Sequence, residues 1–227
     1  MKNYNTILFD ADGTLFDFKR SEREALQKVF AKHNYILDEN VKETYHRINH
    51  FLWEQYELGA INRNMVIYTR FVKLFEEIGI DGDGITFEDE YQEILGGEHA
   101  LLEGAIEVLE YLYPKYELYV VTNGVTKTQM RRLMDSNINK YFKDIFVSET
   151  TGYQKPMREY FDYCFERIPK LDLSKTIIIG DSLSSDIKGG NNAGIDTCWF
   201  NCYDIPKTTH LRIDYEIKNL KELYHIL

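Results

Sequence analysis

Short runs of apolar residues recur along the chain, and each of them ends in a polar loop. The runs occupy residues 6–9, 118–121, 145–147, 177–179 and 197–200. Runs this short and this apolar are typical of strands that are buried on both faces of a parallel sheet. Helical patterns separate most of the runs, at residues 127–136, 157–168 and 185–193. The alternation predicts an open α/β fold, with a doubly wound, mostly parallel sheet and helices on both faces.

One long region breaks this alternation. Residues 21–97 follow a helical period throughout, in successive apolar stripes that stop at glycines. Ser21 and Glu24 have the spacing of a capping box, which would open the first helix. Four antiparallel helices inserted after the first strand would form a small bundle. The sequence therefore predicts a Rossmann-like α/β core, residues 1–17 and 98–227, and a helical cap domain, residues 18–97.

The composition narrows the class of partner. The 227 residues carry 37 Asp and Glu against 27 Lys and Arg, a formal net charge of −10. Binding to a nucleic-acid polymer needs clustered Lys and Arg, so this balance argues against such a partner but not against a small phosphorylated ligand. No apolar stretch approaches the roughly 20 residues that a membrane span needs, so no membrane association is expected. The three cysteines lack C-x-x-C spacing, which indicates reduced thiols in a cytoplasmic protein.

The polar residues with most chemical interest lie in the loops that follow the predicted strands. Four motifs do so: Asp10-Ala11-Asp12-Gly13-Thr14, Thr122-Asn123-Gly124, Lys155-Pro156, and Gly180-Asp181 with Asp186 five residues further on. In open α/β sheets, ligands bind at the carboxyl ends of the strands. Any one of these motifs alone is a common turn or helix cap. Their joint occurrence at strand ends predicts that they converge on one site.

A site built from these motifs would be strongly acidic. Asp10, Asp12, Asp181 and Asp186 would bring four carboxylates together, and such a cluster repels itself unless a hard cation and a base offset it. Mg²⁺ suits oxygen ligands of this kind, and Lys155 is the obvious basic side chain.

The second motif could complete such a site by holding a phosphate. The Thr122 hydroxyl and the backbone N–H groups of Asn123 and Gly124 are suitable donors to phosphate oxygens. Gly13 and Gly124 would let the backbone approach the ligand closely.

Two carboxylates can divide the hydrolysis of a phosphomonoester between them. One attacks phosphorus and forms an acyl phosphate. The other protonates the leaving alkoxide and later deprotonates the water that hydrolyses the intermediate. Asp10 and Asp12 would share a face of an extended strand, but the chain turns past the strand end and can give them different roles.

These four motifs, in this order, resemble the phosphatases of the haloacid dehalogenase superfamily. The resemblance implies that Asp10 is the nucleophile, and that Asp12 is the acid/base and gives its backbone carbonyl to Mg²⁺. It also implies that Asp181 is a metal ligand and Asp186 a supporting carboxylate. Thr122 and Lys155 fall on the second and third motifs, and the helical insert corresponds to the family's cap. Dehalogenases of the superfamily lack a carboxylate at the second position, so Asp12 favours a phosphatase.

Three further segments, residues 49–56, 148–156 and 196–199, resemble the bacterial branch of non-canonical pyrimidine 5′-nucleotidases. This resemblance implies that the substrate is a nucleoside monophosphate. Trp53 and Tyr56 are candidates to stack on its base, although aromatic residues of a helical bundle more commonly pack its core.

Other functions stay open at this point. Within the same superfamily, a sugar-phosphate phosphatase or a phosphomutase has the same core motifs. A phosphoacceptor signalling module of the receiver type also uses Mg²⁺, an Asp, a Thr and a Lys, but a cap of nearly 80 residues would obstruct protein docking. Both a monomer and a homodimer fit the sequence. The interval from Thr122 to Lys155 has room for one helix and one strand, so we expect no second cap there and a site that opens between core and helical insert, with hinges near residues 16–19 and 97–104.

Overall fold

The computed structural model describes residues 2–207 and 210–227. The chain divides into two compact units. The core unit comprises Met1–Phe18 and His99–Leu227, and the helical unit comprises Lys19–Glu98. No described helix combines the length and the apolar character that crossing a membrane requires.

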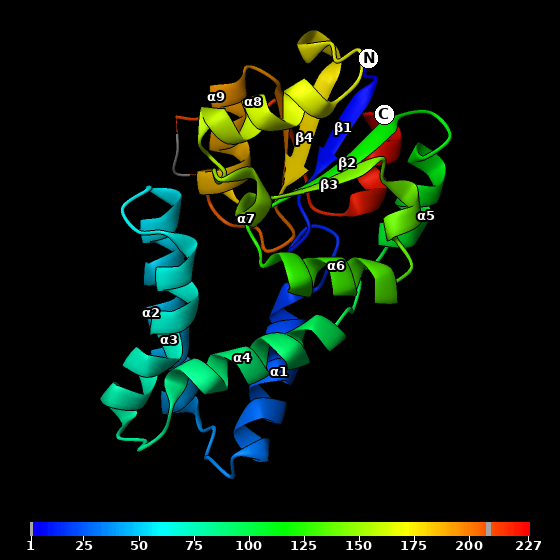
Figure 1. Cartoon of the computed structure of the whole chain (residues 1–227). Helices are drawn as coiled ribbons and strands as arrows, with labels where there is room; N and C mark the ends of the chain where they lie inside the picture. The colour runs from blue at the N-terminus through cyan, green and yellow to red at the C-terminus, as the bar shows by residue number, and fades with distance from the viewer. Residues whose placement is uncertain (1, 208–209) are drawn as a thin grey trace. The chain divides into compact units, whose positions relative to one another are not determined.

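The core unit is built on a single sheet in which every neighbouring pair of strands is parallel (Figure 1). The strand order is β3-β2-β1-β4-β5-β6. The strands are β1 (Thr6–Phe9), β2 (Glu117–Thr122), β3 (Asp144–Val147), β4 (Thr176–Gly180), β5 (Asp196–Phe200) and β6 (Tyr215–Ile217). The predicted α/β class and mostly parallel sheet are confirmed, and the short edge strand β6 is an addition that the sequence pattern did not indicate.

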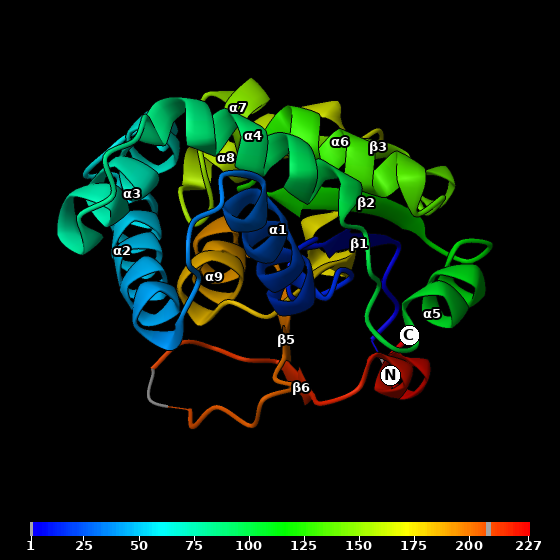
Figure 2. The same cartoon turned by 90° about the horizontal axis from the view of Figure 1, so that it is seen from below.

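Both faces of the sheet are buried, which explains the continuous apolar runs. Successive side chains of a strand point to opposite faces. Ile7 accordingly joins the apolar cluster that contains Val108 and Leu109, whereas Leu8 joins the cluster that contains Tyr160. Figures 1 and 2 show α8 (Arg158–Arg167) and α9 (Lys188–Ala193) on one face and α5 (Ala105–Leu112) on the other.

Shorter elements connect these layers. They are α6 (Thr126–Asp135), α7 (Ser148–Thr151), a π-helical turn η3 (Leu183–Ile187), and the 3₁₀ turns η1 (Asn139–Tyr141), η2 (Leu173–Lys175) and η4 (Leu220–His225). The chain passes from β1 to β2 and β3 on one side, and from β4 to β5 and β6 on the other. The order of strands therefore reverses between β1 and β4, and the loops after these two strands diverge from a switch point where ligands bind in open sheets.

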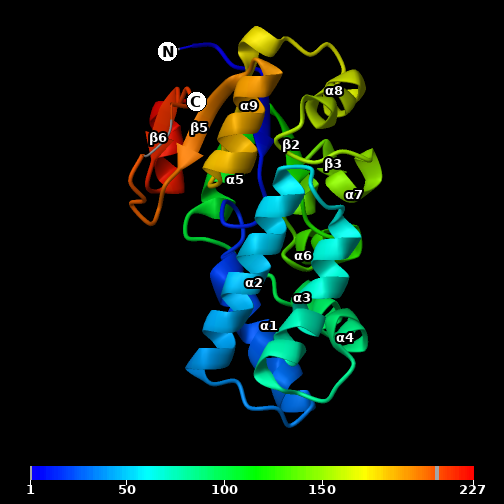
Figure 3. The same ribbon diagram turned by 90° about the vertical axis from the view of Figure 1, so that its left-hand side faces the viewer.

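The helical unit contains α1 (Phe18–Lys32), except for its first residue, and α2 (Glu39–Glu57), α3 (Arg63–Ile78) and α4 (Gly84–Gly97). The side chains of Asp38, Asn62 and Asp83 cap the first turns of the last three helices. Figure 3 shows α2 and α3 side by side and running in opposite directions. Helix α1 begins at Phe18, so the capping box expected at Ser21 is wrong, and the buried Ser21 lies inside the helix.

Candidate active site

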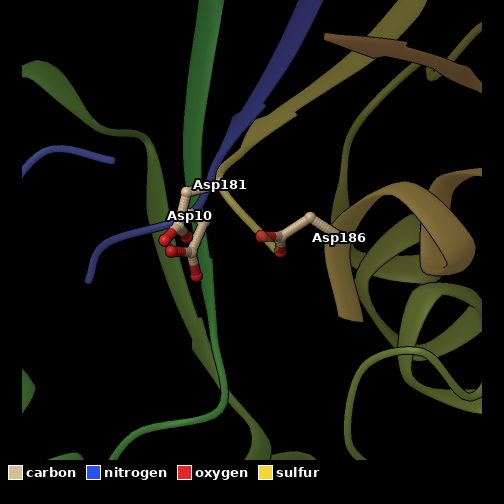
Figure 4. Close-up of side chains that lie close together, drawn as sticks. All are labelled: Asp10, Asp181 and Asp186. Atoms are coloured by element: carbon tan, nitrogen blue, oxygen red, sulfur yellow. The ribbon is translucent and has the colours of Figure 1, made fainter. Parts of the chain in front are cut away.

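Three carboxylates meet at the switch point of the sheet. Asp10 follows β1 directly and Asp181 follows β4, and these two strands are neighbours with Phe9 beside Ile179. Asp186 comes from the π-helical turn η3 after β4. One carboxylate oxygen from each residue lies within 4.8 Å of the others. Figure 4 shows the three side chains grouped at the ends of these strands.

Two glycines make this close grouping possible. Gly13 has a φ of +81°, and a Cβ there would lie 2.3 Å from an oxygen of Asp181. A Cβ on Gly180 would lie 2.3 Å from the carboxylate carbon of Asp186. Any larger residue at either position would therefore displace a carboxylate of the cluster.

Lys155 connects two of the carboxylates, those of Asp10 and Asp186. Its side chain is 1% exposed, and its Nζ donates to Asp10 Oδ1 at 2.6 Å, to Asp186 Oδ1 at 2.6 Å and to the carbonyl oxygen of Val121 at 2.8 Å. The side chain of Asn123 holds the Lys155 backbone, because its Oδ1 accepts from the Lys155 N–H and its Nδ2 donates to the Lys155 carbonyl, both at 2.9 Å. Asn123 thus ties the loop after β2 to the loop that carries the lysine.

The charges of this cluster do not balance, because three carboxylates face one ammonium group. Burial raises the pKa of Asp10 well above its usual range, although Lys155 lowers it, and Asp186 and Asp181 raise it again. Burial, together with the charge of Asp186, raises the pKa of Asp181 to about 7. Burial lowers the pKa of Lys155, but Asp10 and Asp186 outweigh that effect and hold it above its usual value. The donor set is all oxygen and has excess negative charge, which fits Mg²⁺.

The fourth acidic residue, Asp12, has different partners. Its carboxylate does not belong to the group of three, and it pairs instead with the guanidinium group of Arg132 and with Gln129 Nε2, the latter at 2.7 Å. Both partners lie on α6. Asp10 therefore faces the cluster, whereas Asp12, next to the turn at Gly13, contacts the helix that follows β2.

The predicted phosphate-binding motif lies beside Asp12. Thr122 is 2% exposed, and its hydroxyl oxygen accepts hydrogen bonds from the Gly124 N–H at 3.2 Å and from Gln129 Nε2 at 2.9 Å. A Cβ on Gly124 would lie 2.7 Å from the Gln129 side chain, so this glycine gives room to Gln129. The motif is thus internally hydrogen-bonded through a residue of α6.

Three residues of this region were not found from the sequence. Gln129 and Arg132 are buried on α6, and Trp199 of β5 donates from its ring nitrogen to the carbonyl oxygen of Asp181 at 2.9 Å. The available signal was the buried face of the helix at residues 126–135, which carries polar residues where apolar ones are usual. Read alone, this helix looks like an ordinary surface helix.

Trp53 and Tyr56 belong to the helical unit. Both lie on α2, and their rings contact each other edge to face with centroids 5.7 Å apart. Tyr56 is buried, whereas Trp53 is partly exposed. Of the two, Trp53 therefore has the more accessible ring.

Comparisons with known proteins give one matching family and relatives that are similar over nearly the whole chain. A family described as haloacid dehalogenase-like hydrolase matches residues 7–200. The HAD-hydrolase YfnB of Bacillus subtilis is 48% identical over 227 residues, which are 100% of this chain and 97% of that protein. The magnesium-bound crystal structure of YfnB, described as revealing interdomain movement, has a TM-score of 0.95 and covers 100% of this chain and 99% of its own.

Two further relatives have a named substrate class. The pyrimidine 5′-nucleotidase PynA of Streptococcus pneumoniae is 36% identical over 225 residues, 99% of this chain and 95% of that protein. The pyrimidine 5′-nucleotidase YjjG of Escherichia coli is 30% identical over 226 residues, 99% of this chain and 98% of that protein. In all three relatives the similarity extends over nearly the whole length of both proteins.

Proposed function

Because this chain belongs to the haloacid dehalogenase-like hydrolases and is a hydrolase of phosphomonoesters, we propose that it is a Mg²⁺-dependent 5′-nucleotidase that works through an aspartyl phosphate on Asp10. Its proposed substrates are pyrimidine nucleoside monophosphates, including non-canonical ones. The similarity to PynA and YjjG supports the substrate class.

The observation that carries the mechanism is the grouping of Asp10, Lys155, Asp181 and Asp186. Three carboxylates, two of them buried and that of Asp181 partly exposed, against one ammonium group form a site that favours a divalent cation together with a phosphoryl group. Asp10 and Asp181, supported by Asp186 and by the backbone carbonyl of Asp12, would hold Mg²⁺. Bound there, Mg²⁺ supplies charge neutralisation for the phosphoryl oxygens.

The first half of the reaction transfers the phosphoryl group to the enzyme. A carboxylate oxygen of Asp10 bonds to phosphorus while the bond to the leaving oxygen breaks and its electron pair stays with that oxygen. Asp12 donates the proton that the leaving alkoxide needs. Lys155, fixed by Asp10 and Asp186, offsets the negative charge around the transferring group, and the Thr122 hydroxyl and the N–H groups of Asn123 and Gly124 hold its oxygens.

The second half returns the enzyme to its starting state. Asp12, now a carboxylate, takes a proton from a water molecule, whose oxygen attacks the acyl phosphate. Inorganic phosphate leaves, and Asp10 regains its carboxylate. Asp12 thus acts first as acid and then as base, which requires its side chain to be well oriented in both steps.

The helical unit has a separate role in this proposal. Residues 18–97 would act as a cap that selects small substrates, and Trp53 is the better candidate to stack on a nucleobase because its ring is partly exposed. Replacing Trp53 by Ala should then raise KM for nucleoside monophosphates and leave KM for a sugar phosphate unchanged.

A substrate panel tests the function. Purified protein with Mg²⁺ is assayed for phosphate release from pyrimidine and purine nucleoside monophosphates, halogenated pyrimidine monophosphates and sugar phosphates. We expect the highest kcat/KM for the pyrimidine nucleotides. Preference for sugar phosphates would instead indicate a sugar-phosphate phosphatase, isomerisation without phosphate release a mutase, and stoichiometric phosphorylation without turnover a receiver-type module.

The assignment of Asp12 is tested by leaving-group dependence. Asp12→Asn should slow leaving-group release from a nucleoside monophosphate by about 100-fold or more, because general acid catalysis contributes that much for a poor leaving group. Release of nitrophenolate from nitrophenyl phosphate needs no proton and should be spared. Equal losses on both substrates would contradict the acid role.

A further inference from the structure

Two buried side chains of α6 hold the carboxylate of Asp12 at both of its oxygens. Arg132 Nη1 donates to Asp12 Oδ1, and Gln129 Nε2 donates to Asp12 Oδ2 at 2.7 Å. Gln129 is 1% exposed and the Arg132 side chain is fully buried. An Asp side chain has only two rotatable bonds, so donors to both oxygens fix its orientation.

The same glutamine links Asp12 to the residue proposed to bind phosphate. Gln129 Nε2 also donates to the Thr122 hydroxyl oxygen at 2.9 Å, and Gln129 Oε1 accepts from Arg132 Nη1 at 3.0 Å. A Cβ on Gly124 would clash with the glutamine, so the loop after β2 is shaped around it. Four side chains and one glycine thus form a connected network between β1, β2 and α6.

The buried guanidinium group of Arg132 lies beside two aromatic rings. Its guanidinium carbon lies 4.2 Å from the ring centre of Phe16 and 5.7 Å from that of Phe18. Aromatic faces on a buried guanidinium group stabilise the cation and limit its movement. The Asp12 side chain is 26% exposed while Arg132 is not exposed at all. Arg132 is therefore the buried member of this ion pair, and the Asp12 carboxylate is the accessible one.

We propose that Gln129 and Arg132 are positioning residues for the reaction, and that they orient the Asp12 carboxylate for proton exchange with the leaving group and with water. This inference rests on the proposed function. A carboxylate has about four lone-pair sites, so two donors leave acceptor and proton positions on Asp12 for the substrate. Small misplacements of a catalytic group cost much: a shift of about 1 Å can reduce a rate by about 100-fold.

Single-turnover leaving-group release separates positioning from a general structural effect. Gln129→Leu and Arg132→Met remove the two donors at similar volume. We expect each to slow nucleoside release from a nucleoside monophosphate by about 10–100-fold and nitrophenolate release from nitrophenyl phosphate by less than about threefold. Arg132→Lys, which keeps a cationic donor, should recover part of the loss.

The neighbouring arginine provides a matched control. Arg131 precedes Arg132 directly, its side chain is 42% exposed, and it pairs with Asp135 at 3.4 Å. Arg131→Met should leave both leaving-group rates unchanged. In an Asp12→Asn background, Gln129→Leu and Arg132→Met should cause no further loss on the nucleotide, because residues that act through Asp12 are not additive with its removal.

The outcomes are distinguishable. Equal losses on the two substrates, no loss on the nucleotide, or a further loss in the Asp12→Asn background would overturn the inference while leaving the proposed function intact. If the wild-type protein releases neither leaving group, the proposed function fails and the inference fails with it. Should Arg132→Met not fold, as judged by circular dichroism, Gln129→Leu carries the same test.

Discussion

Each unit of the molecule buries a group of charged side chains, and the two groups are built differently. In the core unit, Asp10, Asp181 and Asp186 lie together, and the ammonium group of Lys155 donates to two of them, Asp10 and Asp186. In the helical unit, the centre of the group is Arg70, which is 2% exposed. Most members of both groups are buried, so the free-energy cost of burying charge is high in each.

The group in the helical unit is closely matched. Arg70 donates to both carboxylate oxygens of Glu88, at 2.7 and 2.6 Å, and its third nitrogen donates to Asn49 at 3.0 Å. Glu88 is fully buried. Glu22, at the border of this group, accepts from Asn49 at 3.2 Å and lies 3.5 Å from the ring of the exposed His46. Each of the three nitrogens of the Arg70 guanidinium group therefore has a hydrogen-bond partner.

The difference shows how a functional cluster can be told from a structural one. Arg70 and Glu88 compensate each other's charge and satisfy each other's hydrogen-bonding groups. Their pairing joins α3 to α4 and needs no ligand. Burial raises the pKa of Glu88 as it raises those of Asp10 and Asp181, so the difference lies in the balance of charge, because the core group leaves carboxylates in excess. A surplus of like charge that the protein keeps buried is a feature of functional sites.

The largest expected effect comes from Asp10→Asn. Removing the proposed nucleophile should reduce turnover by about 10⁴-fold or more. The same change removes one of three repelling carboxylates and keeps an oxygen that can accept from Lys155, so the free energy of unfolding of the metal-free protein should rise. Phosphate release and urea denaturation in EDTA measure the two effects. Loss of activity together with loss of stability would mean that the core group is structural, as in the helical unit.

Glu88→Gln is expected to lower the free energy of unfolding, in contrast to Asp10→Asn. This substitution leaves the buried Arg70 without a carboxylate, and breaking a buried ion pair costs about 3–5 kcal/mol of unfolding free energy. Glu90→Gln on the same helix is the matched control, because Glu90 pairs near the surface with Lys32 and His33 and should contribute about 1 kcal/mol or less. Urea denaturation measures both.

A double substitution sharpens this test. Replacing Arg70 by Met together with Glu88 by Leu removes the pair without leaving an unpaired charge, and should recover most of the lost stability. If the double variant is as unstable as Glu88→Gln, charge compensation does not explain the group, and the comparison between the two units fails.

The sequence predicted those parts of the site that depend on where strands end. Asp10 and Asp181 follow apolar runs, and in a parallel sheet the ends of adjacent strands necessarily meet. Lys155 lies beyond α7 in the segment after β3, so its motif, and not a strand end alone, indicated its place. Gln129 and Arg132 could not be placed, because their role depends on which face of α6 packs against the loop that contains Asp12. The buried face of α6 carries Leu133 but otherwise polar residues, so the apolar pattern alone does not show which polar side chains meet that loop.

Local geometry explains the remaining differences. The helix expected over residues 185–193 begins as the π-helical turn Leu183–Ile187, and this wider turn carries Asp186. Strand β6 has only three residues, which is too short to produce a readable alternation. The capping-box spacing at Ser21 is present by coincidence inside a helix that starts at Phe18.

The smallest expected effect concerns pH and Mg²⁺. The pKa of Asp181 is about 7 in the folded, metal-free protein, whereas an unfolded chain has a value of about 3.9. Between these values the folded state binds more protons than the unfolded state, so stability falls as pH rises through this window and the penalty is complete above it. The metal-free protein should therefore become more stable when the pH is lowered from 8 to 6, and Asp10, whose pKa is also raised, adds to the same trend.

Mg²⁺ should reverse this trend, because it binds the deprotonated carboxylates. At a concentration about 100-fold above its Kd, a ligand that binds only the folded state adds about 2.7 kcal/mol. The gain in unfolding free energy should thus be large at pH 8 and much smaller at pH 6, as measured by urea denaturation with Mg²⁺ or EDTA. Asp181→Asn should flatten both dependences, whereas Glu88→Gln should lower stability without changing the increment from Mg²⁺. An equal increment at both pH values would show that the surplus carboxylates are already ionised without the metal, and that the core group differs from the helical one in composition but not in electrostatics.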